Sequence, residues 1–449
     1  MESRYTIPGM SDVLPKQHDY FTFIKKVVRH HARRSGYKRI SLPGLIKLET
    51  LEIMLGKAST VFQKELFIVD IDGVQYAMRP DSTTGTIRAY VENELESLPA
   101  PQEFYYIDQA WRKMDRHGKK MYQTHQFGFE IIGEEDPALD AQLIAMCVHI
   151  FEDVGMSDVR VIINNCGTKA SQEKYNEDLR NFFAGKERSL TTEDQQKLEL
   201  SPMRLLSSIE EDTQILAKIA PTITRSLDNE SKEHHKKVKD YLDVLGIAFE
   251  EDERMFLDAD MYTHTVFRFE AEFEGARIVL GGGGRYNNVI SELGVKRILP
   301  EGAPASAQTI VSAPAVGASV MMEKVEKFME DIHLSVPSKD KLDVFIVQLG
   351  DDAKKVAIKL AADLRARGVK TMGALGKAAI RSQLETAGRF EVKYSLVIGQ
   401  MEVLEKKIII RDMKKGTQET ISFDGIIDRM VELLDPSTLD VKDYRSMIE

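Results

Sequence analysis

A short run of alternating polar and aromatic residues is the first part of this chain whose types and spacing could do chemistry. Gln126, Gly128 and Glu130 alternate with two phenylalanines. A strand would place the three polar positions on one face and the aromatic rings on the other. If that polar face is the floor of a pocket, Glu130 would accept hydrogen bonds from a cationic or NH-bearing ligand. An ordinary surface strand has the same pattern, so the alternation alone leaves both interpretations open.

A basic stretch, residues 112–120, precedes this run and begins with Arg112. It lies between two strand-like segments, Phe104–Asp108 and Phe127–Ile132, and therefore at the tip of a predicted antiparallel hairpin. Arginine and lysine side chains in such a place suit the phosphate oxygens of a nucleotide or of an RNA end. A solvated basic loop would have the same composition, and by itself the stretch favours that simpler interpretation.

A glycine run followed by Arg285 and Tyr286 could let the backbone approach a ligand closely, but a tight turn explains it more simply. The run, Gly281–Gly284, lacks the Gly-Lys-Ser/Thr ending of a phosphate-binding loop and the strand-turn-helix setting of a dinucleotide fingerprint. The ten histidines include no pair spaced as zinc ligands with supporting carboxylates, and there are only two cysteines. We therefore predict no structural metal.

The composition is that of a globular protein with more than one core. The chain has 449 residues, 43% of them hydrophobic and 29% charged, with a formal net charge of −10. A length of about 150 residues per domain predicts about three domains. The mildly acidic balance does not advertise nucleic-acid binding, although a local basic face could still bind phosphates. Because no apolar segment reaches the ~18 residues of a membrane span and the N-terminus has no apolar signal core, we expect a cytoplasmic protein with no membrane partner.

The elements that would position these residues divide the chain into segments. A helical pattern over 17–35 and the strands and helices after it predict a first α/β segment, 1–167. The lysine- and glutamate-rich segment 168–250 predicts a helical insertion. Strand patterns resume over 251–334 and end in a predicted helical segment at 315–331.

The C-terminal part of the chain has a different organisation. Strand-like runs at Val344–Leu349, Val369–Met372 and Tyr394–Ile398 alternate with helical patterns over 341–435. Such alternation predicts a small α/β domain with a mostly parallel sheet. A polar tail, 436–449, follows it.

Taken in order along nearly the whole chain, the motifs resemble those of histidyl-tRNA synthetases, a family of class II aminoacyl-tRNA synthetases. The matching segments are Ile7–Pro15 (the opening motif), Gly36–Pro43 (motif 1), Arg79–Thr83 (the R-P-E-G-T motif), Arg112–Glu130 (motif 2), Tyr262–Phe267 and Gly283–Tyr286 (two histidine-specific motifs), and Ile380–Gln383 and Ile398–Glu402 (the anticodon-binding domain). The resemblance implies an α/β (α+β) fold. It would consist of a catalytic-type domain with an antiparallel sheet and a helical insertion, followed by a C-terminal α/β domain of the anticodon-binding type.

The resemblance also implies roles for the polar positions. The positions that bind substrate in the family correspond to Asp81, Thr83, Gln126, Glu130, Tyr262 and Tyr286. Glu130, Tyr262 and Tyr286 would face the imidazole of histidine. Arg112 matches a position near the substrate carboxylate, and it would contact phosphate in an active enzyme.

Partners follow partly from the resemblance and partly from the residues. Motif 1 of the family carries a proline at a dimer interface, so the segment around Pro43 implies a homodimer. In the C-terminal domain Lys377, Arg381 and Arg411 could meet the phosphates or bases of tRNA, and a solvated face explains them nearly as well.

The nucleotide side of the resemblance departs from the family at four positions. Met114 stands where a glutamate holds the adenine amino group, and a thioether accepts hydrogen bonds weakly. Lys324 replaces an arginine that lies against ATP and lacks its planar fork. Met321 replaces a glycine. Leu257 aligns with a catalytic arginine that helps neutralise the α-phosphate, and it supplies no charge.

These observations favour a histidyl-tRNA synthetase-like protein that binds histidine or a similar ligand, with tRNA as a candidate partner and with adenylation impaired or lost. A divergent but active histidine–tRNA ligase is the first alternative, and it alone would need ATP with magnesium. A histidine sensor resembling a regulatory subunit is the second. No other cofactor is expected.

Overall fold

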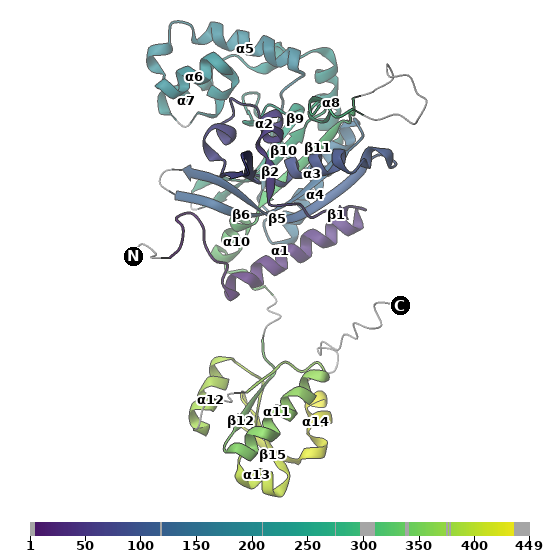
Figure 1. The fold of residues 1–449 in the computed structure, drawn as a ribbon, viewed down its shortest axis with the longest axis vertical. Helices are drawn as coiled ribbons and strands as arrows, with labels where there is room; N and C mark the ends of the chain where they lie inside the picture. The colour runs from purple at the N-terminus through teal and green to yellow at the C-terminus, as the bar shows by residue number, and fades with distance from the viewer. Residues whose placement is uncertain are drawn as a thin grey trace. The chain divides into compact units, whose positions relative to one another are not determined.

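The computed structural model describes residues 5–116, 119–208, 210–273, 275–296, 310–336, 341–373, 376 and 379–434. These residues belong to two compact units, 1–336 and 337–449 (Figure 1). Each unit has its own hydrophobic core. Within the described ranges, no helix is long and apolar enough to cross a membrane.

A mostly antiparallel sheet organises the N-terminal unit. In the described residues it has eight strands in the order β1-β5-β6-β11-β10-β9-β7-β8, and only the two outermost pairings are parallel. The strands are β1 (Lys38–Arg39), β5 (Gln102–Arg116), β6 (Lys119–Ile132), β7 (Arg160–Asn165), β8 (Phe249–Glu251), β9 (Thr263–Phe273), β10 (Ala276–Arg285) and β11 (Ala315–Met321). The long β5–β6 hairpin confirms the hairpin predicted around the basic stretch.

One face of this sheet is buried by helices. Phenylalanines that alternate along β6 and β9 lie in the main core together with apolar residues of four helices. These helices are α1 (Pro15–Arg34), α4 (Pro137–Asp153), α8 (Asn229–Val244) and α10 (Met322–Asp331). The other face carries the polar positions of β6, and helix α3 (Ser82–Glu92) packs there. The alternation of aromatic and polar residues thus separates a core face from a face that can hold a ligand.

The remaining elements of the N-terminal unit surround the sheet (Figure 1). Helices α5, α6 and α7 lie beside one another in the segment predicted to be helical. A small sheet in the order β2-β4-β3 precedes α3 in the sequence. The bounds are α2 (Leu48–Leu55), α5 (Lys169–Phe183), α6 (Thr192–Leu200), α7 (Glu211–Ile219), α9 (Val289–Glu292), β2 (Leu45–Lys47), β3 (Ile68–Ile71), β4 (Val74–Met78) and a π-helical turn at Val61–Glu65.

The C-terminal unit is a five-stranded sheet with helices, in the order β13-β12-β14-β15-β16. Its elements are β12 (Val344–Gln348), α11 (Asp351–Ala366), β13 (Thr371–Gly373), α12 (Ile380–Arg389), β14 (Tyr394–Ile398), α13 (Gln400–Glu405), β15 (Lys407–Asp412), β16 (Gln418–Ser422) and α14 (Ile426–Leu433). The strand–helix alternation predicted here is present. The sheet is not mostly parallel, however, because β14, β15 and β16 pair antiparallel.

Two other predictions about secondary structure are wrong. The glycine run Gly281–Gly284 lies within β10 rather than in a turn, and the reason is space. A Cβ at Gly282 or Gly284 would come within 2.5 or 2.6 Å of a carbonyl oxygen of β9. The segment 315–331 begins as strand β11 and becomes helical only at Met322, because the apolar residues of β11 fill the sheet between β6 and β10.

A buried ion pair joins α4 to the end of β10. Asp136 and Pro137 begin α4 as its N-cap and first residue, and the next turn carries Asp140. The side chains of Asp140 and Arg285 form an ion pair, and neither is exposed. Burial would raise the pKa of Asp140, but the charge of Arg285 and a hydrogen bond from His234 outweigh it and lower that pKa. The pair therefore stays ionised inside the fold.

This pair makes a prediction about stability. Asp140→Asn leaves the Arg285 guanidinium without its counter-charge, and breaking a buried pair costs about 3–5 kcal/mol. We expect a clear drop in the melting temperature of the N-terminal unit by calorimetry. Asp153→Asn is the matched control, because Asp153 pairs with His31 while its side chain is 56% exposed. Equal melting temperatures for the two variants would contradict the role given to the buried pair.

Candidate functional site

The Glu130 carboxylate is the centre of a fully buried cluster of hydroxyl groups. Oε1 accepts from the Thr83 hydroxyl at 2.6 Å and from the Tyr106 hydroxyl at 3.2 Å, and Oε2 accepts from the Tyr286 hydroxyl. Burial raises the pKa of the Glu130 carboxyl to about 8, while the hydrogen bonds from Thr83 and Tyr286 act in the opposite direction. A carboxyl group whose pKa lies near neutral pH can donate a hydrogen bond to a ligand when protonated and accept one when ionised.

Glycines on the neighbouring strands leave the space that this cluster occupies. The Glu130 carboxylate lies where a Cβ on Gly317 would stand, and the Tyr106 hydroxyl lies where one on Gly128 would stand. The ring of Tyr262 lies 2.9 Å from the position of a Cβ on Gly284. The polar face of β6 is therefore a buried layer of crossing polar side chains rather than an ordinary surface.

Tyr262 and Asp81 lie in the electrostatic field of the same cluster. Burial raises the pKa of the Tyr262 hydroxyl, and the carboxylates of Asp81 and Glu130 raise it further, while Arg112 lowers it. Asp81 is the N-cap of α3 and accepts from the backbone N–H of Thr84 at 2.9 Å. This cap fixes the start of α3 and with it the position of Thr83.

Gln126 is on the same face of β6, two positions before Gly128. It is 8% exposed, and its Oε1 is buried with no hydrogen-bond partner among the residues that the structure describes. Its neighbours across the sheet are Asp108 on β5 and Met321 on β11. A buried amide oxygen without a partner is costly, so a bound donor here would be stabilising.

Arg112 is held by a carboxylate of its own chain. Its Nε and Nη2 both donate to Oε2 of Glu65, at 2.8 and 2.5 Å. Glu65 ends the π-helical turn at Val61–Glu65, and the preceding Lys64 pairs with Glu193 of α6 at 2.6 Å. Two of the three guanidinium nitrogens of Arg112 are thus already in use.

The four positions expected to depart from the family lie in different parts of the N-terminal unit. Met114 is on β5 beside Met121, after a bulge in the hairpin. Met321 ends β11, and the Lys324 ammonium donates to the backbone carbonyl of Val279. Leu257 lines a cavity of about 220 Å³ between the insertion and the loop before β9. The nearby cation Arg204 is buried and paired with two aspartates, Asp258 and Asp260.

The three candidate RNA-binding residues are not brought together by any described contact. The Arg381 side chain on α12 is 93% exposed and pairs with Glu385 one turn later. Arg411 is on β15, opposite Ser395 of β14. Lys377 lies outside the described residues.

Sequence reasoning missed two members of the site, Tyr106 and Glu65. Tyr106 is on the strand next to Gly128 in the register of the hairpin, and that cross-strand register was the signal that could have found it. Glu65 is 47 residues before Arg112, and no local pattern links them.

Comparisons with known proteins place this arrangement in a family. Residues 9–325 match the family model for histidyl-tRNA synthetase, and residues 343–433 match that for an anticodon binding domain. A histidine–tRNA ligase of Bacillus licheniformis is 31% identical over 428 residues, which are 94% of this chain and 97% of the relative.

Solved structures show the same likeness. Apo histidyl-tRNA synthetase of Staphylococcus aureus matches with a TM-score of 0.75 and 29% identity over 95% of this chain and 99% of that one. A Bacillus halodurans protein described as an ATP phosphoribosyltransferase regulatory subunit/histidyl-tRNA synthetase shares the fold, with a TM-score of 0.60 and 20% identity over 89% of this chain and 98% of that one. On the strength of its two family models and its full-length relatives, this chain belongs to the histidyl-tRNA synthetase family of class II aminoacyl-tRNA synthetases.

Proposed function

We propose that this chain binds histidine, or a ligand with the same imidazole and amino-acid groups, with the imidazole against Glu130, and that its adenylation step is impaired. The observation that carries the first half is the buried cluster of Thr83, Tyr106 and Tyr286 hydroxyls on Glu130. Polar groups held in a dry pocket discriminate strongly, because a wrong ligand leaves them unpaired. Asp81 and the unpartnered Gln126 would meet the amino-acid end of the ligand.

The second half of the proposal is supported by the cations on the nucleotide side. The family uses ATP with magnesium, so we asked whether the residues present suit a triphosphate. Arg112 is bound by Glu65, Lys324 donates to a backbone carbonyl, and Leu257 has no charge. Cations that are absent or already paired cannot neutralise phosphate charge without breaking other contacts. These residues do not fit the group.

A working histidine–tRNA ligase remains a second candidate, and one observation favours it. The match extends through the anticodon binding domain at 343–433, and a chain that had lost all tRNA chemistry would have no evident use for that domain. We propose that this domain binds tRNA, with Arg381, Arg411 and Lys377 as candidate contacts, and that the protein is cytoplasmic. A purely regulatory, histidine-sensing role has less support, since the likeness to the Bacillus halodurans protein extends to the fold alone.

We also propose that the chain forms a homodimer through the side that carries Pro43 and the small sheet. Pro43 is exposed, and so are the apolar side chains of Leu45, Ile68, Val69, Ile71 and Val74 on β2, β3 and β4. An edge strand with every residue exposed is a surface that proteins normally cover. A second copy would cover it.

The first prediction separates binding from adenylation. Isothermal calorimetry is expected to show histidine binding that Glu130→Ala abolishes, while histidine-dependent ATP–pyrophosphate exchange stays at background. The triple variant Met114→Glu, Leu257→Arg, Lys324→Arg is the gain-of-function control, because it returns an adenine acceptor and two planar cations. We expect it to raise exchange by about tenfold or more. Strong exchange by the unaltered chain would overturn the impairment and support the ligase.

The second prediction concerns pH. The pKa of the Glu130 carboxyl is about 8, and that of a free histidine side chain is about 6.5. Between pH 6.5 and pH 8, roughly, the carboxyl is therefore protonated and the imidazole is neutral. The two groups then share one proton, so binding releases and takes up none. Below about pH 6.5 a proton must leave on binding, and above about pH 8 one must be taken up, so the affinity falls on both sides. Calorimetry across pH should give a bell-shaped affinity profile, and Glu130→Gln should remove its alkaline limb. A flat profile for the unaltered chain would contradict this pairing.

The third prediction tests the dimer. Val69 and Ile71 are two residues apart on β3 and share one face with Val74. The double variant Val69→Lys, Ile71→Lys should shift the protein from dimer to monomer in light scattering at micromolar concentration. Val244→Lys is the control, because Val244 is also apolar and 83% exposed but is on α8. A monomeric unaltered chain would remove the proposal.

A further inference from the structure

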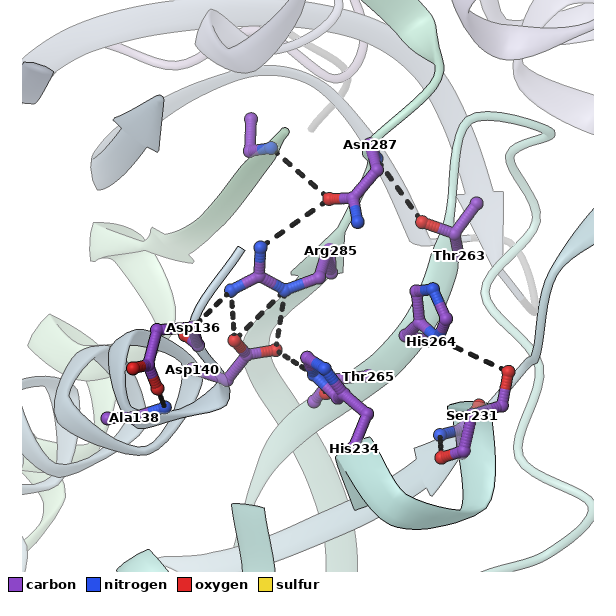
Figure 2. A network of polar contacts seen from close by, with 12 residues as sticks. Asp136, Ala138, Asp140, Ser231, His234, Thr263, His264, Thr265, Arg285 and Asn287 are labelled. Carbon is purple, nitrogen blue, oxygen red and sulfur yellow. Dashed lines mark hydrogen bonds and ion pairs between the residues drawn. The ribbon is translucent and has the colours of Figure 1, made fainter. Parts of the chain in front are cut away.

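A network of polar contacts joins helix α8 of the insertion to Asp140 of α4 and to Arg285 at the end of β10 (Figure 2). Its centre is Arg285, the last residue of β10. Its Nε donates to Oδ1 and Oδ2 of Asp140 at 3.2 and 3.0 Å, its Nη1 donates to the carbonyl of Glu134 at 3.0 Å, and its Nη2 donates to the carbonyl of Asp136 at 3.2 Å. The guanidinium is thereby held rigidly against the start of α4.

The chain on the other side of Arg285 carries the pocket tyrosine. Tyr286 follows directly, and its backbone N–H donates to the carbonyl of Ala315 at 2.8 Å. The next residue, Asn287, donates its N–H to the Thr263 hydroxyl at 3.2 Å and accepts from the N–H of Ala315 at 3.3 Å. Tyr286 therefore lies between two anchors, the Arg285 side chain before it and the bonds of Asn287 after it, and the direction of its hydroxyl toward Glu130 depends on both.

Helix α8 reaches the same ion pair through His234. Its Nε2 lies 3.4 Å from Oδ1 of Asp140 and 3.1 Å from the hydroxyl oxygen of Thr265. An ionised carboxylate can only accept, so Nε2 carries the proton and donates. The hydrogen bond from His234 is one of the causes that lower the pKa of Asp140.

A second contact aligns the ring of His234. The His264 ring stacks on it with centroids 5.1 Å apart and 28° between the planes. His264 is in the left-handed region, at φ 51°, where the pairing of β9 with β10 shifts register. Its Nδ1 lies 3.2 Å from the Ser231 hydroxyl, which belongs to the first turn of α8. Ser231 and His234, one turn apart on α8, therefore both contact His264 at the register shift between β9 and β10.

We propose that His234 is a positioning residue for the histidine pocket: by holding Asp140 it fixes Arg285, and through Arg285 it aims the Tyr286 hydroxyl at Glu130. Helix α8 of the insertion is in this way coupled to ligand binding. The inference rests on the proposed histidine site, and it adds a residue that does not itself touch the ligand.

The experiment compares two substitutions at one position with a neighbour. His234→Phe keeps a ring to stack on His264 but removes the donor to Asp140, whereas His234→Gln keeps a donor. His235→Phe is the control on the same helix, since His235 Nε2 bonds Glu251 at 3.0 Å and contacts no part of the network. Histidine affinity is measured by calorimetry, and the titration of the Glu130 carboxyl by ¹³C NMR, with Glu130→Gln identifying the signal.

His234→Phe should weaken histidine binding about tenfold, because a displaced Tyr286 leaves a buried carboxylate short of one donor. It should also raise the pKa of the Glu130 carboxyl, because the Tyr286 hydrogen bond is one of the causes that lower it. His234→Gln should restore both values, and His235→Phe should change neither.

Two outcomes would overturn the coupling. One is an unchanged Glu130 titration in His234→Phe. The other is an equal loss of affinity in all three variants, which would indicate general destabilisation. If the unaltered chain binds no histidine, the proposed function fails, and the NMR titration still decides whether His234 positions Tyr286.

Discussion

The rest of the site depends on the burial of a single carboxylate at the centre of a sheet. Glu130 has no solvent exposure, and a buried carboxylate is stable only when hydrogen-bond donors surround it. Three hydroxyls from three different elements supply them: Thr83 from α3, Tyr106 from β5 and Tyr286 from the end of β10. The side chains of this cluster occupy space that a Cβ on Gly128 or Gly317 would fill, so these two positions must be glycine. The requirement for one buried carboxyl group thus reaches the helix cap at Asp81, the glycine run and the ion pair behind Arg285.

The two halves of the site are under different physical constraints. The amino-acid half is interlocked, since each group contacts the next and substituting one leaves another unpaired in a dry environment. The nucleotide half consists of separate positions, the cations Arg112 on β5 and Lys324 on α10 and the uncharged Leu257 in the loop before β9. Each of these positions is linked to a different part of the fold, through Glu65 for Arg112 and through Val279 for Lys324. Separate groups can change one at a time, whereas an interlocked cluster resists change. This difference is the physical basis of the proposal that the chain keeps one half and alters the other.

Local sequence patterns predicted the elements whose period is uniform, and they failed where tertiary contacts decide. The alternation at Gln126–Glu130 indicated a strand with one polar face, which is correct, but whether that face is buried depends on helix α3, far away in sequence. The glycine run suggested a turn because glycine usually marks turns, yet here the crowding of β9 and β11 demands it within a strand. The strand at 315–321 runs directly into the helix at 322–331 with no glycine or proline between them, so no local signal marks the boundary. Tyr106 and Glu65 could not be found without the cross-strand register and the path of the π-helical turn.

The arrangement of donors on Glu130 has a consequence for selectivity. A carboxylate offers about four acceptor positions, and Thr83, Tyr106 and Tyr286 occupy three of them, two on Oε1 and one on Oε2. A single acceptor position remains, on Oε2. A guanidinium, which binds carboxylates through two parallel N–H groups, cannot form its fork there without displacing a hydroxyl, and an ammonium would leave two of its three donors unpaired. An imidazole presents one N–H in the plane of its ring and meets one position with one donor. In the proposed histidine site the buried hydroxyls would thus favour a ring that donates one N–H over the side chains of arginine and lysine, whatever their size.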